Sequence, residues 1–223
     1  MSGSHDDARA AVAEASRRLA AEGLLVGTAG NVSVRAGEHV AVTATGAELA
    51  AVTPAEVTVV DLTGSVVAGE LEPTSEIDLH LGVYAHHDAL AVVHTHAPEA
   101  TALSCVLEEL PCLHYQQLVL GGSVPVVPYA TFGTPELAAS VVDALTGRQA
   151  ALMANHGSVA TGASLDKAVE NALLLEWLCG LYRRATAVGT PRPLDDAQQA
   201  AVITAAIERK YGETRPVKQK EES

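Results

Sequence analysis

The segment Ala91-Val-Val-His-Thr-His96 carries both a fold signal and the sharpest chemical signal of this 223-residue chain. Its β-branched residues, followed by Pro98, predict a strand over 91–96. Residues two apart on a strand project to the same face, so His94 and His96 can converge on one ion. A lone core histidine is usually satisfied by a hydrogen bond, but two imidazoles behind an apolar run are costly to bury unless something uses their lone pairs. The pair therefore indicates a metal site.

Outward from this segment, short apolar or alternating runs between Gly, Pro and Asn turns predict further strands at 32–35, 39–43, 56–61, 124–127 and 150–153. Apolar residues at helical spacing predict helices at 6–22, 75–87, 99–107, 134–147, 164–187 and 195–210. Ser4 is a candidate cap of the first helix. The apolar stripe expected on the longest helix consists of Val169, Leu173, Leu174, Trp177 and Leu181. This order predicts one α/β domain with a mainly antiparallel sheet flanked by helices.

Composition narrows the class of protein. The net charge of −13 argues against a nucleic-acid binder, because neutralising phosphates needs clustered Lys and Arg, but a phosphorylated small molecule needs only a local pocket. No apolar run approaches the ~20 residues of a membrane span, and the acidic amino terminus does not resemble a signal peptide. Cys105, Cys112 and Cys179 have no metal-like spacing and are expected to be reduced thiols. We expect a cytoplasmic protein that binds neither nucleic acid nor membranes.

Two further residues are candidates for the same site as the histidine pair. His156, in Ala154-Asn-His-Gly157, follows an apolar strand and precedes a glycine, where a bend exposes the side chain. It is either a third imidazole ligand or an ordinary turn histidine. Glu76, in Pro73-Thr-Ser-Glu76, is predicted in the first turn of a helix, where the macrodipole favours a carboxylate. It could also be a fourth ligand, or a base whose pKa a nearby dication controls.

Three donor-rich turns could hold an anion: Gly27-Thr-Ala-Gly-Asn31, Thr45-Gly46 and Thr74-Ser75. Each taken alone is more often only a turn. The glycine pattern is no dinucleotide fingerprint, because it leads into a strand and not a helix, and it lacks the Lys of a P-loop.

Taken in order, these motifs resemble the class II aldolase/adducin family, and within it the bacterial L-fuculose-1-phosphate aldolases. The resemblance rests on Gly-Thr-Ala-Gly-Asn-Val-Ser-Val-Arg, Thr-Ala-Thr-Gly, Pro-Thr-Ser-Glu, His-Thr-His, Pro-Tyr-Ala-Thr-Phe-Gly-Thr-Pro-Glu-Leu and Asn-His-Gly. It covers roughly residues 6–211, and implies a three-layer fold with a domain at 1–211 and a charged tail at 212–223.

The resemblance implies a role for each candidate. His94, His96 and His156 would bind one Zn²⁺ per subunit, and Glu76 would complete the coordination and then serve as base. The phosphate of dihydroxyacetone phosphate would be held by the turn residues Gly30, Asn31, Thr45, Gly46, Thr74 and Ser75. Related sequences often have Ser at the position of Thr74. Because Thr74 also carries a hydroxyl group, this difference is expected to be mild.

The implied reaction is the reversible cleavage of L-fuculose 1-phosphate to dihydroxyacetone phosphate and L-lactaldehyde through a metal-stabilised enediolate. Tyr115 matches a family tyrosine that enters the active site from a neighbouring subunit and protonates the aldehyde oxygen, and Tyr211 resembles a second one from the tail. The family members of this type are homotetramers with active sites between subunits.

Other activities occur on the same scaffold. Pentulose-phosphate 4-epimerases tend to have Asp where this chain has Glu76, which favours the aldolase. Methylthioribulose-phosphate dehydratases and 5-deoxypentose-phosphate aldolases use similar pockets and stay open as alternatives. A non-catalytic adducin-like module is disfavoured, because loss of ligands is its expected mark and the four candidate ligands are intact.

Overall fold

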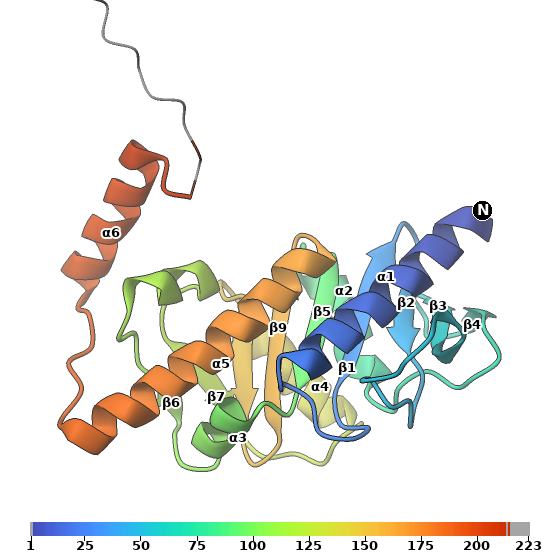
Figure 1. Cartoon of the computed structure of the whole chain (residues 1–223), viewed down its shortest axis with the longest axis horizontal. Coiled ribbons are helices and arrows are strands. Elements are labelled where there is room, and N and C mark those ends of the chain that lie inside the picture. The colour runs from blue at the N-terminus through green and yellow to red at the C-terminus, as the bar shows by residue number, and fades with distance from the viewer. Residues whose placement is uncertain (1, 213, 215–223) are drawn as a thin grey trace, which may run out of the picture.

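The computed structural model describes residues 2–212 and 214. Its strands form one sheet of nine in the order β4-β3-β2-β1-β5-β9-β8-β7-β6 (Figure 1). The strands are β1 (Asn31–Ala36), β2 (His39–Thr43), β3 (Val57–Asp61), β4 (Val66–Ala68), β5 (Ala91–Thr95), β6 (Glu109–Leu110), β7 (Val124–Val127), β8 (Ala150–Met153) and β9 (Gly157–Gly162). Neighbouring strands are antiparallel except β7 and β8, which are parallel. The predicted mainly antiparallel α/β fold is thus confirmed.

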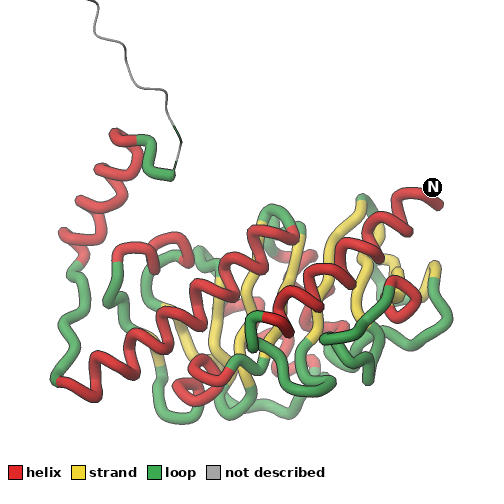
Figure 2. The backbone as a smooth tube through the Cα atoms, viewed as in Figure 1, coloured by secondary structure: helices red, strands yellow, loops and turns green. Residues whose placement is uncertain are grey.

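Helices cover both faces of the sheet (Figure 2). One layer holds α1 (Ser2–Ala21), α3 (Pro98–Ser104) and α5 (Leu165–Val188), and the other holds α2 (Ile77–His86) and α4 (Pro135–Ala144). Two short 3₁₀ helices, η1 (Pro54–Glu56) and η2 (Tyr115–Leu120), lie in connections. The last helix, α6 (Asp196–Arg209), stands away from the sheet at one end (Figure 1). None of the described helices is long and apolar enough to cross a membrane.

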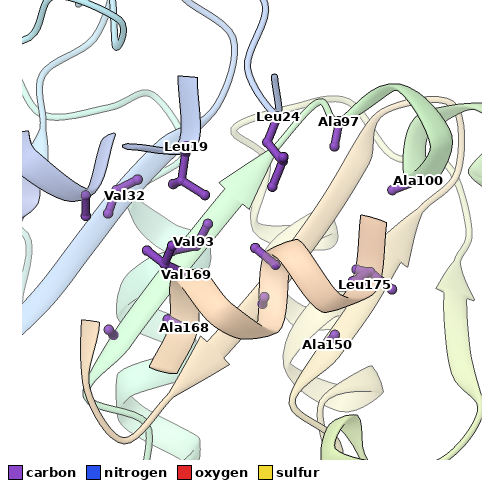
Figure 3. Packing of buried hydrophobic residues seen from close by; sticks show 14 of the residues in the cluster. Leu19, Leu24, Val32, Val93, Ala97, Ala100, Ala150, Ala168, Val169 and Leu175 are labelled. Carbon is purple, nitrogen blue, oxygen red and sulfur yellow. The ribbon is translucent and has the colours of Figure 1, made fainter. Parts of the chain in front are cut away.

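The core on the α1–α3–α5 side is built largely from small and branched side chains (Figure 3). Leu19 of α1 and Leu175 of α5 are fully buried, as is Val93 of β5. Burying a Leu or Val side chain contributes roughly 1.5–3 kcal/mol each. Because Ala97, Ala100, Ala150 and Ala168 add little bulk, the helices can approach the sheet closely, which makes the central strands a rigid base for the site.

Several sequence predictions about single elements were wrong. β9 was not predicted, because Gly-Ser-Val-Ala-Thr-Gly is short, small and bounded by glycines, yet all six of its residues are buried. The short strands β4 and β6 and both 3₁₀ helices were also not predicted. The helix α1 begins at Ser2, so Ser4 lies inside it and is no cap.

The buried face of α5 differs from the predicted stripe. Val169 of that stripe is buried, but Leu173, Leu174 and Leu181 are half-buried and Trp177 is 45% exposed. The helix instead buries Ala168, Ala172, Leu175, Leu178 and Cys179, a face in which small residues allow a close approach to β9. The predicted tail at 212–223 lies outside the described residues except for 212 and 214.

Candidate active site

The three histidines that the sequence singled out meet at one end of the central strands. His94 lies on β5, His96 follows the end of that strand, and His156 lies in the turn between β8 and β9. One nitrogen from each ring lies within 4.8 Å of the other two. The ring centroids are 4.8–5.0 Å apart. The histidine cluster (His94, His96 and His156) therefore has the spacing of a metal-binding group.

The β8–β9 turn aims His156 at this point. Asn155 adopts a left-handed conformation with φ 57°, and the backbone N–H of His156 donates to the carbonyl of Met153 at 3.0 Å. The next residue, Gly157, leaves no room for a Cβ, because that atom would collide with the carbonyl oxygen of Thr95. The sharp turn and the close approach of β9 to β5 bring His156 beside His94.

The hydrogen bonds around the cluster are compatible with a bound cation. His94 Nδ1 lies 2.9 Å from the carbonyl oxygen of Ser158, which can only accept, so Nδ1 donates to it and Nε2 is the ring atom that would face a metal. His94 Nε2 lies 3.1 Å from Glu76 Oε2 and 3.1 Å from His96 Nε2. Glu76 Oε1 is buried without a hydrogen-bond partner, 3.6 Å from His156 Nε2. Acceptors that converge in this way fit a bound metal ion.

The protonation states suit a dication as well. Burial, together with the neighbouring imidazoles, lowers the pKa of His96 to about 4, and burial also lowers the pKa of His156. Burial alone would raise the pKa of Glu76, but contact with His94 and a hydrogen bond from Asn31 outweigh it and hold the pKa below its usual value. At neutral pH the site therefore offers the neutral imidazoles of His96 and His156 and an ionised carboxylate, the forms that bind metal.

A cavity of about 530 Å³ opens beside the cluster. His96, His156 and Glu76 line it, whereas His94 is buried behind them. All six residues predicted to hold phosphate also line it: Gly30, Asn31, Thr45, Gly46, Thr74 and Ser75. None of the described residues that line this cavity is Lys or Arg, so an anion there would rely on backbone N–H and hydroxyl donors.

Backbone pairing explains why three distant turns meet at this cavity. An isolated bridge joins Ala44 to Pro73, and the Thr74 N–H donates to the carbonyl of Thr43 at 3.0 Å, which places the second turn against the third. Gly30, at φ +99°, brings the first turn against β5, where a Cβ would lie 2.8 Å from the carbonyl oxygen of His94. A side chain at that position would push the turn off the strand.

Glu76 differs from its predicted position in one respect. It is the N-cap residue of α2, which begins at Ile77, and its side chain makes no capping hydrogen bond. The carboxylate turns toward the histidines while Glu76 keeps its place at the start of the helix.

Two aromatic residues of the cavity had no role in the sequence analysis. Tyr129 and Phe132, which follow β7, are 65% and 64% exposed and line the opening. The signal that could have found them was available: Phe132 is the only Phe of a chain with 3% aromatic residues, and both lie in a motif that carried the resemblance.

The two predicted tyrosines lie away from this cavity. Tyr115 begins η2 and Tyr211 follows α6, and their hydroxyl oxygens are 3.0 Å apart. They line a separate apolar groove between η2, α5 and α6. The hydrogen bond with Tyr211 raises the pKa of Tyr115. Within one chain the structure does not bring either tyrosine to the histidine cluster.

Comparison with known proteins agrees with this site. The 5-methylthioribulose-1-phosphate/5-deoxyribulose-1-phosphate aldolase of Rhodospirillum rubrum is 37% identical over 203 residues, which cover 89% of this chain and 91% of that protein. The L-fuculose phosphate aldolase of Escherichia coli K12 is 40% identical over 183 residues, covering 81% and 85%. A solved L-fuculose 1-phosphate aldolase superposes with a TM-score of 0.86 at 35% identity, covering 92% of this chain and 97% of that one.

The family model described as Class II Aldolase and Adducin N-terminal domain matches residues 10–183, a range that holds the histidine cluster, Glu76 and the three turns of the cavity. With the fold, the site and these relatives in agreement, the chain belongs to the class II aldolase/adducin family.

Proposed function

We propose that this protein is a zinc-dependent aldolase that cleaves a ketose 1-phosphate, L-fuculose 1-phosphate in the first instance, to dihydroxyacetone phosphate and an aldehyde such as L-lactaldehyde. The observation that carries the proposal is the ionised Glu76 beside the histidine cluster, at the edge of a cavity ringed by neutral hydrogen-bond donors. A phosphorylated sugar needs such donors, and its reacting carbons need such a base.

The metal would be held by His94, His96, His156 and, in the resting enzyme, Glu76, with one ion per subunit. Zinc bound there would supply a Lewis acid for the ketone and hydroxyl oxygens of the dihydroxyacetone unit. Three neutral ligands suit that task, because they leave most of the charge of the dication available.

Phosphate binding and proton transfer would be carried out by residues of the protein and not by the metal. The turns with Gly30, Asn31, Thr45, Gly46, Thr74 and Ser75 would hold the phosphate at one end of the cavity. Glu76 would remove a proton from the hydroxymethyl carbon of dihydroxyacetone phosphate during synthesis and return it after cleavage. Oε1 suits this proton transfer, because no hydrogen bond occupies it.

A proton donor for the aldehyde oxygen would come from a second subunit. Tyr115 and Tyr211 are exposed on their own chain, at 41% and 63%, and are therefore available to a neighbour. We accordingly propose a homotetramer with active sites between subunits, in which Tyr115 is the donor and Tyr211 assists. Residues 1–211 would form the catalytic domain and 212–223 the tail, in a cytoplasmic enzyme.

The cavity also fits a second class of candidate substrate. Tyr129 and Phe132 offer an apolar surface there, which suits the methyl end that L-fuculose 1-phosphate and 5-deoxyribulose 1-phosphate share, and the longer methylthio end of 5-methylthioribulose 1-phosphate. The Rhodospirillum rubrum relative is named for substrates with such ends. A 5-deoxyribulose 1-phosphate or 5-methylthioribulose 1-phosphate aldolase is therefore the alternative.

The test combines elemental analysis with cleavage of all three phosphoketoses before and after chelation. We expect close to one zinc ion per chain and release of dihydroxyacetone phosphate that chelation abolishes and zinc restores. The substrate with the highest kcat/KM assigns the aldehyde half. A protein without a divalent metal, or cleavage that survives complete metal removal, would contradict the proposal.

A further inference from the structure

Five buried polar side chains form a hydrogen-bond chain behind the cavity, which we term the α2–β1 chain: Glu76, Asn31, His80, Ser33 and Tyr84. No member is more than 6% exposed. Glu76, His80 and Tyr84 lie four residues apart at the start and along α2, while Asn31 and Ser33 lie two apart on β1. The three residues of the α2 segment therefore share one face of the helix, the two residues of β1 share one face of the strand, and these two faces lie against each other.

The donor at each link follows from chemistry. Asn31 Nδ2 donates to the carboxylate oxygen Oε2 of Glu76 at 2.8 Å, so Asn31 Oδ1 faces His80 and must accept. His80 Nε2 therefore carries the proton. Burial lowers the pKa of His80 to about 3, so the ring is neutral and its Nδ1 must accept.

Ser33 and Tyr84, at the end of the α2–β1 chain farthest from Glu76, continue the same order of donors and acceptors. The hydroxyl of Ser33 lies 2.6 Å from His80 Nδ1 and donates to it. The hydroxyl of Tyr84 lies 2.6 Å from Ser33 Oγ and donates in turn. The donors thus run in one direction, from Tyr84 to Glu76.

The order fixes how Glu76 presents its carboxylate. With the other His80 tautomer, unprotonated Nε2 would face Asn31 Oδ1, acceptor against acceptor, and a flipped amide would set Oδ1 against the carboxylate. Both arrangements are penalised in a buried site. The observed order anchors Oε2 and leaves Oε1 without a hydrogen bond.

We propose that His80 is a positioning residue for the reaction. Its Nε2–H tautomer locks the amide of Asn31, which in turn holds Glu76 Oε2 and leaves Oε1 beside His156 without a hydrogen bond. The role rests on the proposed function of Glu76 as base. His80 touches neither substrate nor metal in this role, and acts only through Asn31.

The tautomer can be tested without any activity. We expect a long-range ¹H–¹⁵N spectrum of ¹⁵N-histidine-labelled protein to show, at neutral pH, a His80 ring with protonated Nε2 and unprotonated Nδ1. The signal is assigned by its loss in His80→Gln. The side-chain amide signals of Asn31 should shift in His80→Leu and stay near their wild-type positions in His80→Gln, whose amide can still donate. A His80 ring protonated at Nδ1 would overturn the proposal.

Kinetics supply the second readout. His80→Leu should lower kcat about 100-fold, the loss expected when a general base is misplaced by roughly 1 Å, while KM changes less than about threefold, because only Asn31 of the six proposed phosphate-binding residues is hydrogen-bonded to His80. His80→Gln should retain kcat within about fivefold of wild type. Val83→Ala is the matched control, since it truncates a side chain on the buried face of α2 but removes no hydrogen bond of the α2–β1 chain.

Each result separates the inference from the proposed function. A fall in kcat as large in His80→Gln or in Val83→Ala as in His80→Leu would mean that His80 serves stability alone. A rise in KM at constant kcat would move its role to binding and overturn the inference. If wild-type protein cleaved no phosphoketose, the proposed function would fail, while the spectra would still decide whether His80 orients Asn31.

Discussion

Two effects of its surroundings shift the pKa of the Glu76 carboxylate in opposite directions. Burial favours the neutral acid, but Asn31 and the nearby imidazoles favour the anion and prevail. Its two oxygens are also unequal, because Oε2 accepts from Asn31 while Oε1 accepts nothing. A residue with one anchored and one free oxygen is oriented without being neutralised, which is what a general base requires.

Glu76→Gln is the direct test at this scale. We expect the fold to persist, because the amide oxygen can still accept from Asn31, and exchange of the hydroxymethyl proton of dihydroxyacetone phosphate into D₂O to fall about 10²–10⁴-fold. The exchange is followed by NMR and the fold by circular dichroism. Wild-type exchange in this variant would remove Glu76 from the role of base.

The burial of His80 predicts that the free energy of unfolding depends on pH. Its pKa is about 3 in the folded protein, because burial disfavours the charged ring, and about 6.5 in the unfolded chain. Between these values the unfolded state binds the extra proton, so the contribution of His80 is fully present above pH 6.5 and is lost as pH falls toward 3. The loss amounts to roughly 2 kcal/mol between pH 7 and pH 5.

Chemical denaturation of chelator-treated protein at pH 7, 6 and 5 measures this slope. His80→Gln should reduce the decline by about the stated amount. Val83→Ala provides the control, since it changes a buried side chain of the same helix without removing a titratable group and should leave the slope unchanged. An identical slope in wild type and His80→Gln would show that His80 is not buried in its neutral form.

At the scale of elements, the site depends on how closely β9 approaches β5. The two strands pair antiparallel from Ala91↔Gly162 to Thr95↔Ser158, and this register sets Ser158 beside His94. The turn before β9 carries His156. One pair of strands therefore supplies two candidate ligands and the carbonyl that orients one of them, so a small shift of β9 changes the site as a whole.

Gly157→Ala tests that dependence. The new methyl group would collide with the Thr95 carbonyl, so β9 must move outward. We expect a loss of about 1–3 kcal/mol in unfolding free energy and weaker zinc binding in a chelator competition. Gly189→Ala is the control, because a Cβ there meets open space. Unchanged zinc affinity in Gly157→Ala would show that the strand contact does not position His156.

At the scale of the whole molecule, α6 and η2 form a surface that the single chain leaves open. None of the described residues of α6 is buried, and Ile203 and Ile207 are 50% and 73% exposed. The same region holds Tyr115 and Tyr211, neither of which lines the cavity beside the histidine cluster of their own chain. If either tyrosine takes part in the reaction, it does so in another copy of the chain.

Mixing subunits tests this arrangement. Tyr115→Phe should slow aldol cleavage but leave proton exchange largely intact, whereas Glu76→Gln should lose both. Co-refolding the two variants in equal amounts should restore cleavage in about a quarter of the sites of a tetramer, because each restored site takes Glu76 from one subunit and Tyr115 from a particular neighbour. Activity no higher than the average of the separate variants would contradict sites between subunits.

Much of this fold was predictable because local sequence patterns identify most of its helices and strands. β-Branching predicted β5, short apolar runs predicted β7 and β8, and helical spacing predicted α2, α4 and α5 within a few residues. β9 and part of the buried face of α5 escaped prediction. Both contain small residues whose burial depends on how closely a neighbouring element approaches, and no local pattern records that distance.

For the site, the chemical types could be identified from the order of residues alone: the imidazoles at 94, 96 and 156, the carboxylate at 76 and the donor-rich turns. The packing of the sheet was needed to show that these segments meet at one cavity, that the Glu76 carboxylate faces the histidines, and that His80 lies behind it. The physical reason is that residue type and periodicity act within a few residues of the chain. Convergence, desolvation and hydrogen-bond order instead arise between β1, α2, β5 and β9, which only the packed sheet brings into contact.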